Sequence, residues 1–135
     1  MPHELKGFFR ACCVDLLNAY NAAWQDPTVI NQEDALRLAI NSAAPRFWIS
    51  PEEAARQISR MEKGLEPRVR KNSNKYHALM ELYPIYKRLK EKRFRHESTT
   101  FVCAFACLEQ ASRFYISLHR ARRIITKINN GEYIL

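Results

Sequence analysis

The chain has 135 residues, of which 47% are hydrophobic and 27% charged, and its formal net charge is +8. A chain of this length buries about two thirds of its unfolded surface on folding, so we expect one compact domain that needs no disulfide framework. No stretch approaches the ~18 consecutive apolar residues of a membrane span, and the first residues lack a signal-peptide pattern. Four cysteines without an export signal indicate free thiols, which predicts a cytoplasmic protein.

The first two expected helices precede a proline. Residues 4–24 carry apolar side chains at spacings of three and four, which predicts a helix with one buried face running as far as Tyr20 and Trp24. Residues 31–43 predict a shorter second helix. Pro45 ends this helical pattern, so the segment "PRFWIS" should be a connector.

A capping box marks the start of the third helix. Ser50, Pro51 and Glu53 supply an N-cap, a proline at the first turn and a glutamate three residues after the cap. Gly64 stands where a left-handed C-cap is needed. The third helix should therefore occupy the residues between Ser50 and Gly64.

Three further helices are expected after a linker. Residues 65–71 directly follow a glycine, contain a proline and are rich in basic residues. This composition is typical of a linker. Residues 72–94, 98–111 and 117–130 then predict three helices. Pro84 lies inside the first of these, where we expect it to kink or break the helix.

The segments 44–64 and 111–131 are similar at an offset of 67 residues. They share nine identities: Ala44/Ala111, Arg46/Arg113, Phe47/Phe114, Ile49/Ile116, Ser50/Ser117, Ala54/Ala121, Arg56/Arg123, Ile58/Ile125 and Gly64/Gly131. Such self-similarity indicates a repeat. We therefore expect an all-α protein, a single domain over residues 1–135, built from two duplicated three-helix units at 3–64 and 72–131.

The cysteines invite a metal site, because Cys103 and Cys107 lie four residues apart on an expected helix. At the repeat offset, however, these two stand opposite Leu36 and Ile40. The same comparison pairs Cys12 and Cys13 with Leu79 and Met80. Free cysteine behaves as a small hydrophobe, so we interpret all four as core residues. With only three glycines and no catalytic or metal-binding motif, the sequence predicts no cofactor, no metal and no enzymatic activity.

Positive charge is concentrated in the second half of the chain. Residues 1–67 have a net charge of −2 and residues 68–135 a net charge of +10. A basic field of this size attracts polyanions, of which nucleic acid is the commonest inside a cell. We expect a non-catalytic accessory protein that binds nucleic acid, with DNA as the favoured partner. The contacts should come from the last helix and from the basic end of the fourth helix. The candidate contact residues are Arg120, Arg122, Arg123, Lys127, Lys92, Arg93 and Arg95.

Two alternatives accompany this hypothesis. The basic half could instead dock an acidic protein partner, or its charges could simply be solvated.

In outline, the second and third helices with their "RFWIS" connector resemble a helix-turn-helix, and the last helix presents His119, Arg120, Arg123 and Lys127 outward. The repeated connector itself favours a structural role, with Phe47, Phe114, Ile49 and Ile116 as anchors.

The motif A-[PS]-R-F-[WY], followed by a serine-capped helix S-x-x-x-A-R-x-I, occurs twice in the chain. In this it resembles a group of short bacterial proteins of the Bacteroides type, several of which accompany mobile elements. The resemblance implies no activity and no site residues. A mobile-element setting would favour contact with nucleic acid.

Overall fold

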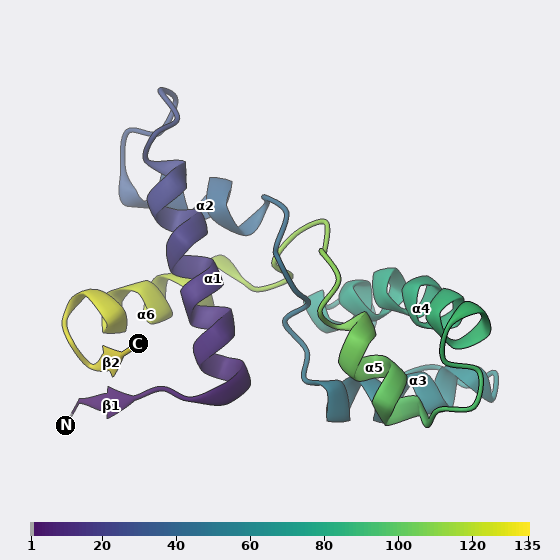
Figure 1. Ribbon diagram of the computed structural model, residues 1–135. Coiled ribbons are helices and arrows are strands. Elements are labelled where there is room, and N and C mark those ends of the chain that lie inside the picture. Colours follow the sequence, from purple (N-terminus) through teal and green to yellow (C-terminus); the bar gives the residue numbers. More distant parts are fainter. Residues whose placement is uncertain (1) are drawn as a thin grey trace. The chain divides into compact units, whose positions relative to one another are not determined.

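A computed structural model describes residues 2–135 and is all-helical apart from two short strands (Figure 1). The elements in chain order are β1 (His3–Glu4), α1 (Gly7–Ala23), α2 (Gln32–Ile40), α3 (Pro51–Glu62), α4 (Asn74–Lys92), α5 (Thr99–Ala106), α6 (Leu118–Asn129) and β2 (Tyr133–Ile134). The all-α expectation is confirmed. In the described part of the chain, no helix is long and apolar enough to cross a bilayer.

The chain forms two compact units whose boundaries fall inside the similar segments. Unit 1 consists of residues 2–44 and 112–135, and unit 2 consists of residues 45–111. In unit 1, α1 packs against α2 and both contact α6; in unit 2, α4 packs against α5 and both contact α3. Each unit therefore takes its third helix from the other half of the chain. The expected segments 3–64 and 72–131 do not coincide with these compact units.

This exchange of helices separates the members of each expected helix-turn-helix pair. Helices α2 and α3 belong to different units, and so do α5 and α6. Each helix that follows a connector packs within the same unit as that connector. In unit 2, α3 packs on α5, and in unit 1, α6 packs on α2. The helix-turn-helix interpretation of these consecutive helices is wrong.

One backbone hydrogen bond fixes each connector within its unit. In unit 2 the Phe47 N–H donates to the Cys107 carbonyl at 2.9 Å, and in unit 1 the Phe114 N–H donates to the Ile40 carbonyl at 3.1 Å. Both phenylalanine rings are fully buried, and Ile49 and Ile116 are nearly so. The connectors are therefore part of the two cores, as the sequence predicts.

Both helices that follow a connector have the caps expected from the sequence. The side-chain oxygens of Ser50 and Ser117 accept hydrogen bonds from the N–H groups of Glu53 and Arg120. After α3, Gly64 has a φ of +77°, and its N–H donates to the Met61 carbonyl while the next N–H donates to that of Arg60. This is a Schellman ending. Gly131, with a φ of +82°, also ends α6 in the left-handed conformation, but the next N–H, that of Glu132, donates to the Asn130 side chain.

Replacement of Ser117 by alanine should lower the free energy of unfolding by about 1 kcal/mol, because the N-terminal N–H groups of α6 lose their side-chain acceptor. Urea denaturation followed by circular dichroism measures this loss. Thr100→Ala, an exposed site on α5, is the control and should change stability by less than about 0.5 kcal/mol. Equal stability of the two variants would show that the cap contributes nothing.

All four cysteines are buried and unpaired with one another, which confirms their interpretation as core residues. One other expectation is wrong. Trp24, expected on the buried face of the first helix, is the C-cap residue of α1 and is 42% exposed. The break expected as one alternative at Pro84 does not occur: α4 continues through this residue, which lies on the solvent side, where the carbonyl left without its N–H partner can be hydrated.

The two short strands pair in parallel, with His3 opposite Tyr133 and Glu4 opposite Ile134. The pairing places the beginning of the described chain beside the end of α6 (Figure 1). Arg10 reinforces it, since its Nε donates to the Leu135 carbonyl at 2.7 Å. The pairing positions residues from both ends of the chain next to the charged face of α6.

Candidate nucleic-acid interface

Helix α6 is strongly amphipathic, and its faces follow from its sequence. Ala121, Ile124 and Ile125 are buried against unit 1. Arg120, Arg123 and Lys127 follow one another at spacings of three and four residues, so they share one face of the helix. This face is the central part of the candidate interface.

A hollow of about 170 Å³ opens on that face. We call it the α6 hollow; its lining residues are Phe9, Arg120, Arg123, Ile124, Lys127 and Tyr133. Three of its lining side chains carry positive charge, which makes it suitable for an anion.

Two aromatic rings support this hollow. The rings of Phe9 and Tyr133 meet edge to face with centroids 5.9 Å apart. The Lys127 ammonium lies 5.1 Å from the centre of the Tyr133 ring, in a cation–π contact that orients the lysine. Strand β2 brings Tyr133 to this position, so the strand pairing contributes directly to the site.

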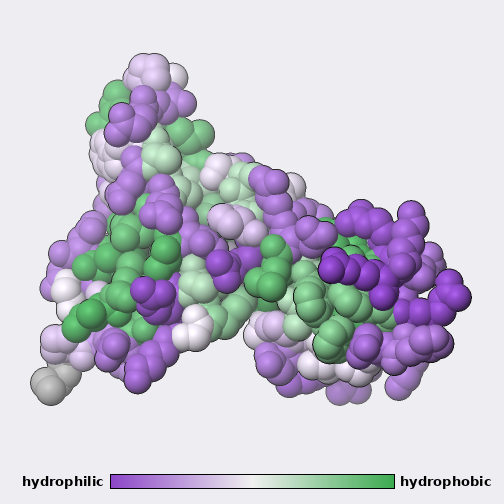
Figure 2. All heavy atoms as spheres, in the orientation of Figure 1, coloured by the Kyte–Doolittle hydropathy of each residue, from purple (hydrophilic) through white to green (hydrophobic). Residues whose placement is uncertain are grey.

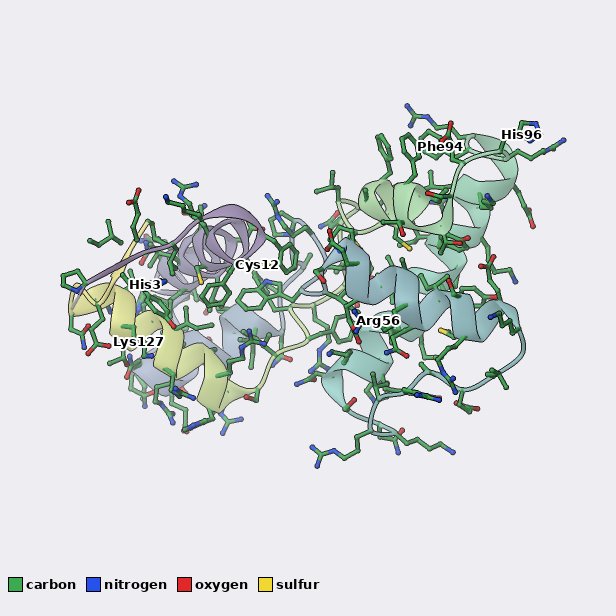
Figure 3. The ribbon with its side chains drawn as sticks, turned by 90° about the horizontal axis from the view of Figure 1, so that it is seen from below. His3, Cys12, Arg56, Phe94, His96 and Lys127 are labelled. Atoms are coloured by element: carbon green, nitrogen blue, oxygen red, sulfur yellow. The ribbon has the colours of Figure 1, made fainter. Side chains whose placement is uncertain are left out.

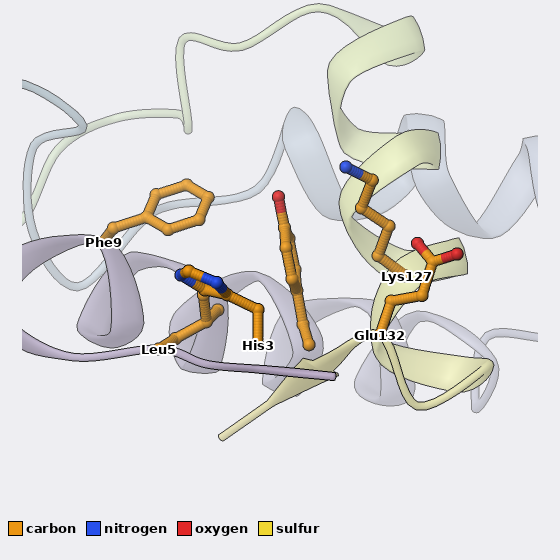
Figure 4. Close-up of a pocket in the computed structure, with 6 residues that line it drawn as sticks. His3, Leu5, Phe9, Lys127 and Glu132 are labelled. Carbon is orange, nitrogen blue, oxygen red and sulfur yellow. The ribbon is translucent and has the colours of Figure 1, made fainter. Parts of the chain in front are cut away.

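A second, wider hollow of about 380 Å³ adjoins the first and shares Phe9, Lys127 and Tyr133 with it (Figure 4). It adds His3 and Leu5 from the start of the described chain, and Glu132 from the turn before β2. Glu132 is the one carboxylate among the described residues that line the two hollows. The positive charge is therefore concentrated at the α6 end.

The first turn of α6 carries no acidic residue but includes Arg120, whereas α3 has Glu52 and Glu53 at its start. Cations near a helix N-terminus are unfavourable, because that end of the helix dipole is positive. Near Arg120 the guanidinium and the positive end of the dipole thus have the same sign, which is unfavourable for the helix. Lys127 lies in the last turn, at the opposite end of α6.

The predicted contact residues fall into two groups in different units. Arg120, Arg123 and Lys127 line the α6 hollow of unit 1. Arg122 lies on another flank of α6, where its guanidinium is 3.4 Å from the Glu33 carboxylate of α2. The structure does not bring it into the hollow, since it is engaged in holding α6 to α2.

The other three predicted contacts, Lys92, Arg93 and Arg95, are exposed at the end of α4 in unit 2. The Arg93 guanidinium lies 5.1 Å from the centre of the Phe94 ring. Lys92 borders a shallow hollow on α4 that also includes Tyr83 and Lys87. Arg93 and Lys92 thus lie beside half-buried aromatic side chains, a feature that the sequence pattern does not reveal.

The buried thiols of Cys13, Cys103 and Cys107 are expected to be unreactive, because burial raises their pKa values. Burial raises the pKa of Cys13 to about 11 and the pKa values of Cys103 and Cys107 to about 12. A thiol with such a pKa stays protonated at neutral pH and is a poor nucleophile and metal ligand. Within residues 2–135, no three His, Cys, Asp or Glu side chains are grouped as a metal site would require.

The comparisons with known proteins identify no relative for these units or for the α6 hollow. No protein-family model, curated protein or solved structure matches the chain.

Proposed function

We propose that this protein is a non-catalytic accessory protein that binds nucleic acid, with phosphates held in the α6 hollow. The observation that carries the proposal is the convergence of Arg120, Arg123 and Lys127 on one hollow of about 170 Å³. Phosphate contacts of this kind give affinity and register without reading sequence. The net charge of +10 in residues 68–135 supports the same partner.

The exposed cations Lys92, Arg93 and Arg95 at the end of α4 are a second phosphate-binding group in this proposal. Cations in the last turn of a helix also complement its dipole, so this group stabilises α4 as well as attracting a polyanion. Arg122 contributes indirectly, because its ion pair with Glu33 fixes α6 against α2.

Combined replacement of Arg120 and Arg123 by alanine should weaken DNA binding and reduce the slope of log K against log salt by about two. Each arginine that neutralises a phosphate releases close to one counterion, so two lost contacts change the slope by that amount. Fluorescence anisotropy of a labelled DNA, titrated at several salt concentrations, measures both quantities. A polyglutamate of similar length tests the alternative acidic protein partner.

The matched control is Arg37→Ala with Arg56→Ala, which removes the same charge from exposed arginines paired with Glu33 and Glu53. This variant should keep most of the affinity and slope. Equal losses in the two double variants would attribute binding to net charge and contradict the assignment of the α6 hollow. Preference for polyglutamate over DNA would support the protein-docking alternative.

We also propose that the chain arose by duplication of a three-helix segment whose third helices were then exchanged. The two connector hydrogen bonds support this, because both donor and acceptor shift by the same 67 residues between Phe47–Cys107 and Phe114–Ile40. The serine caps and the left-handed glycines shift by the same number. In α3, Arg56 and Arg60 stand at the positions of Arg123 and Lys127, but Glu53 stands at that of Arg120 and pairs with Arg56. The face of three cations on α6 would then be an acquired difference between the copies.

A further inference from the structure

Three phenylalanine rings gather on the surface of unit 2. Phe94 comes from the turn between α4 and α5, shown in Figure 3 near His96, and Phe101 and Phe105 come from α5. The ring centroids are 5.3 Å apart for Phe94–Phe101, 4.8 Å for Phe94–Phe105 and 5.3 Å for Phe101–Phe105. We call this cluster the phenylalanine platform.

The platform faces solvent because α5 buries its other side. Val102, Cys103 and Ala106 of α5 are in the core, whereas Phe101 and Phe105 are each 41% exposed. Figure 2 shows apolar residues at the surface of this unit beside strongly hydrophilic ones. Contiguous exposed aromatic surface is unfavourable in water, and on a folded protein it commonly marks a binding site.

Positive charge borders the platform. Lys92, Arg93 and Arg95 lie immediately before and after Phe94 in sequence, and the Arg93 guanidinium is in cation–π distance of the Phe94 ring. On the same turn, the Lys90 ammonium donates to the Glu97 carbonyl and so braces the loop that carries them. A ligand that fits this surface has flat apolar groups and repeated negative charges.

A single-stranded nucleic acid has both properties, since its unpaired bases expose their π-faces along an anionic backbone. In a duplex the bases are already stacked on one another and offer no free faces. A membrane surface fits less well, because interfacial helices present long apolar faces, whereas α5 has eight residues.

We propose that the phenylalanine platform stacks unpaired bases while the neighbouring cations hold the phosphates of the same strand, which makes single-stranded nucleic acid the preferred ligand. This inference rests on the proposed nucleic-acid-binding function and specifies its partner. The residues involved are Phe94, Phe101, Phe105, Lys92, Arg93 and Arg95.

The test compares four ligands in anisotropy titrations at one salt concentration: a mixed-sequence single strand, its duplex, an abasic strand of equal length and anionic lipid vesicles. The variant is Phe101→Leu with Phe105→Leu, which keeps apolar bulk and removes two π-faces. The control is Phe8→Leu, an exposed phenylalanine of unit 1. Circular dichroism verifies that both variants fold.

We expect the platform variant to bind the mixed-sequence strand about 5- to 100-fold more weakly, the range that loss of base stacking produces. Its affinity for the duplex and for the abasic strand should not change, and the control should match the wild type. If the wild type binds DNA and the platform variant binds every ligand as tightly as the wild type does, the role of the platform is overturned. The proposed function would then remain intact.

Two other outcomes would also overturn the proposal. Failure of the wild type to bind any of the nucleic acids would contradict the proposed function, and the platform with it. Vesicle binding that is lost in the platform variant, without a selective loss for the single strand, would assign the platform to a lipid surface.

Discussion

A fragment comprising residues 45–111 should fold alone into a helical structure, whereas a fragment comprising residues 1–67 should remain largely unfolded. The first fragment contains all of unit 2, including both partners of the Phe47–Cys107 hydrogen bond. The second contains residues 3–64, the expected first copy of the repeat, but lacks α6, which covers α1 and α2, and α4 and α5, which cover α3. Without these partners its amphipathic faces stay in water, and isolated helices of this length are marginal.

Circular dichroism and amide proton dispersion in NMR spectra measure the difference, with the full chain as reference. The fragments have the same length, so size does not account for the result. A cooperative thermal transition in the 1–67 fragment would contradict the exchange of helices, because it would mean that α3 packs stably with α1 and α2. An unfolded 45–111 fragment would show that unit 2 depends on the rest of the chain.

Replacement of Phe114 by alanine should lower the free energy of unfolding by about 3–5 kcal/mol. Its ring is fully buried in unit 1, and its backbone N–H anchors the connector to Ile40. A small protein has a total stability of about 5–15 kcal/mol, so this single cavity removes a large share of it. Urea denaturation followed by circular dichroism measures the change.

Phe8→Ala is the control, because it removes the same ring from an exposed position and should lower stability by less than about 1 kcal/mol. Phe114→Leu should retain more of the stability than Phe114→Ala, since it leaves a smaller cavity. A Phe114→Ala protein as stable as the control variant would contradict the role of this connector in the core.

The helices, their caps and most of the core were predictable because local sequence determines them. Ser50 and Ser117 reveal their caps through the residues that follow, and Gly64 and Gly131 reveal left-handed ends. The exchange of third helices was not predictable in this way. The inner faces of α3 and α6 are alike, so their periodicity indicates that each is buried without indicating which helices cover it.

The candidate site was predictable to a similar extent. Spacings of three and four place Arg120, Arg123 and Lys127 together on one face of the helix. The same geometry places Arg122 on another face, because it is one residue from Arg123 and thus about 100° around the helix. The contribution of Tyr133 was hidden, because it depends on strand pairing between residues far apart in sequence. Phe101 and Phe105 could have been noticed, since they lie four apart on the side of α5 opposite its cysteine.

The hydrogen bond between Phe47 and Cys107 has a consequence for the order of folding. Closure of unit 1 joins Ile40 to Phe114 across a loop of roughly seventy residues. Once unit 2 has formed, Phe47 is already joined to Cys107, so the effective loop shrinks to the roughly dozen residues between Ile40 and Phe47 and between Cys107 and Phe114. The entropic cost of that closure falls by roughly 1.5 kcal/mol. Unit 2 should therefore form first, and during synthesis the apolar faces of α1 and α2 must wait for α6, which is made after all of unit 2.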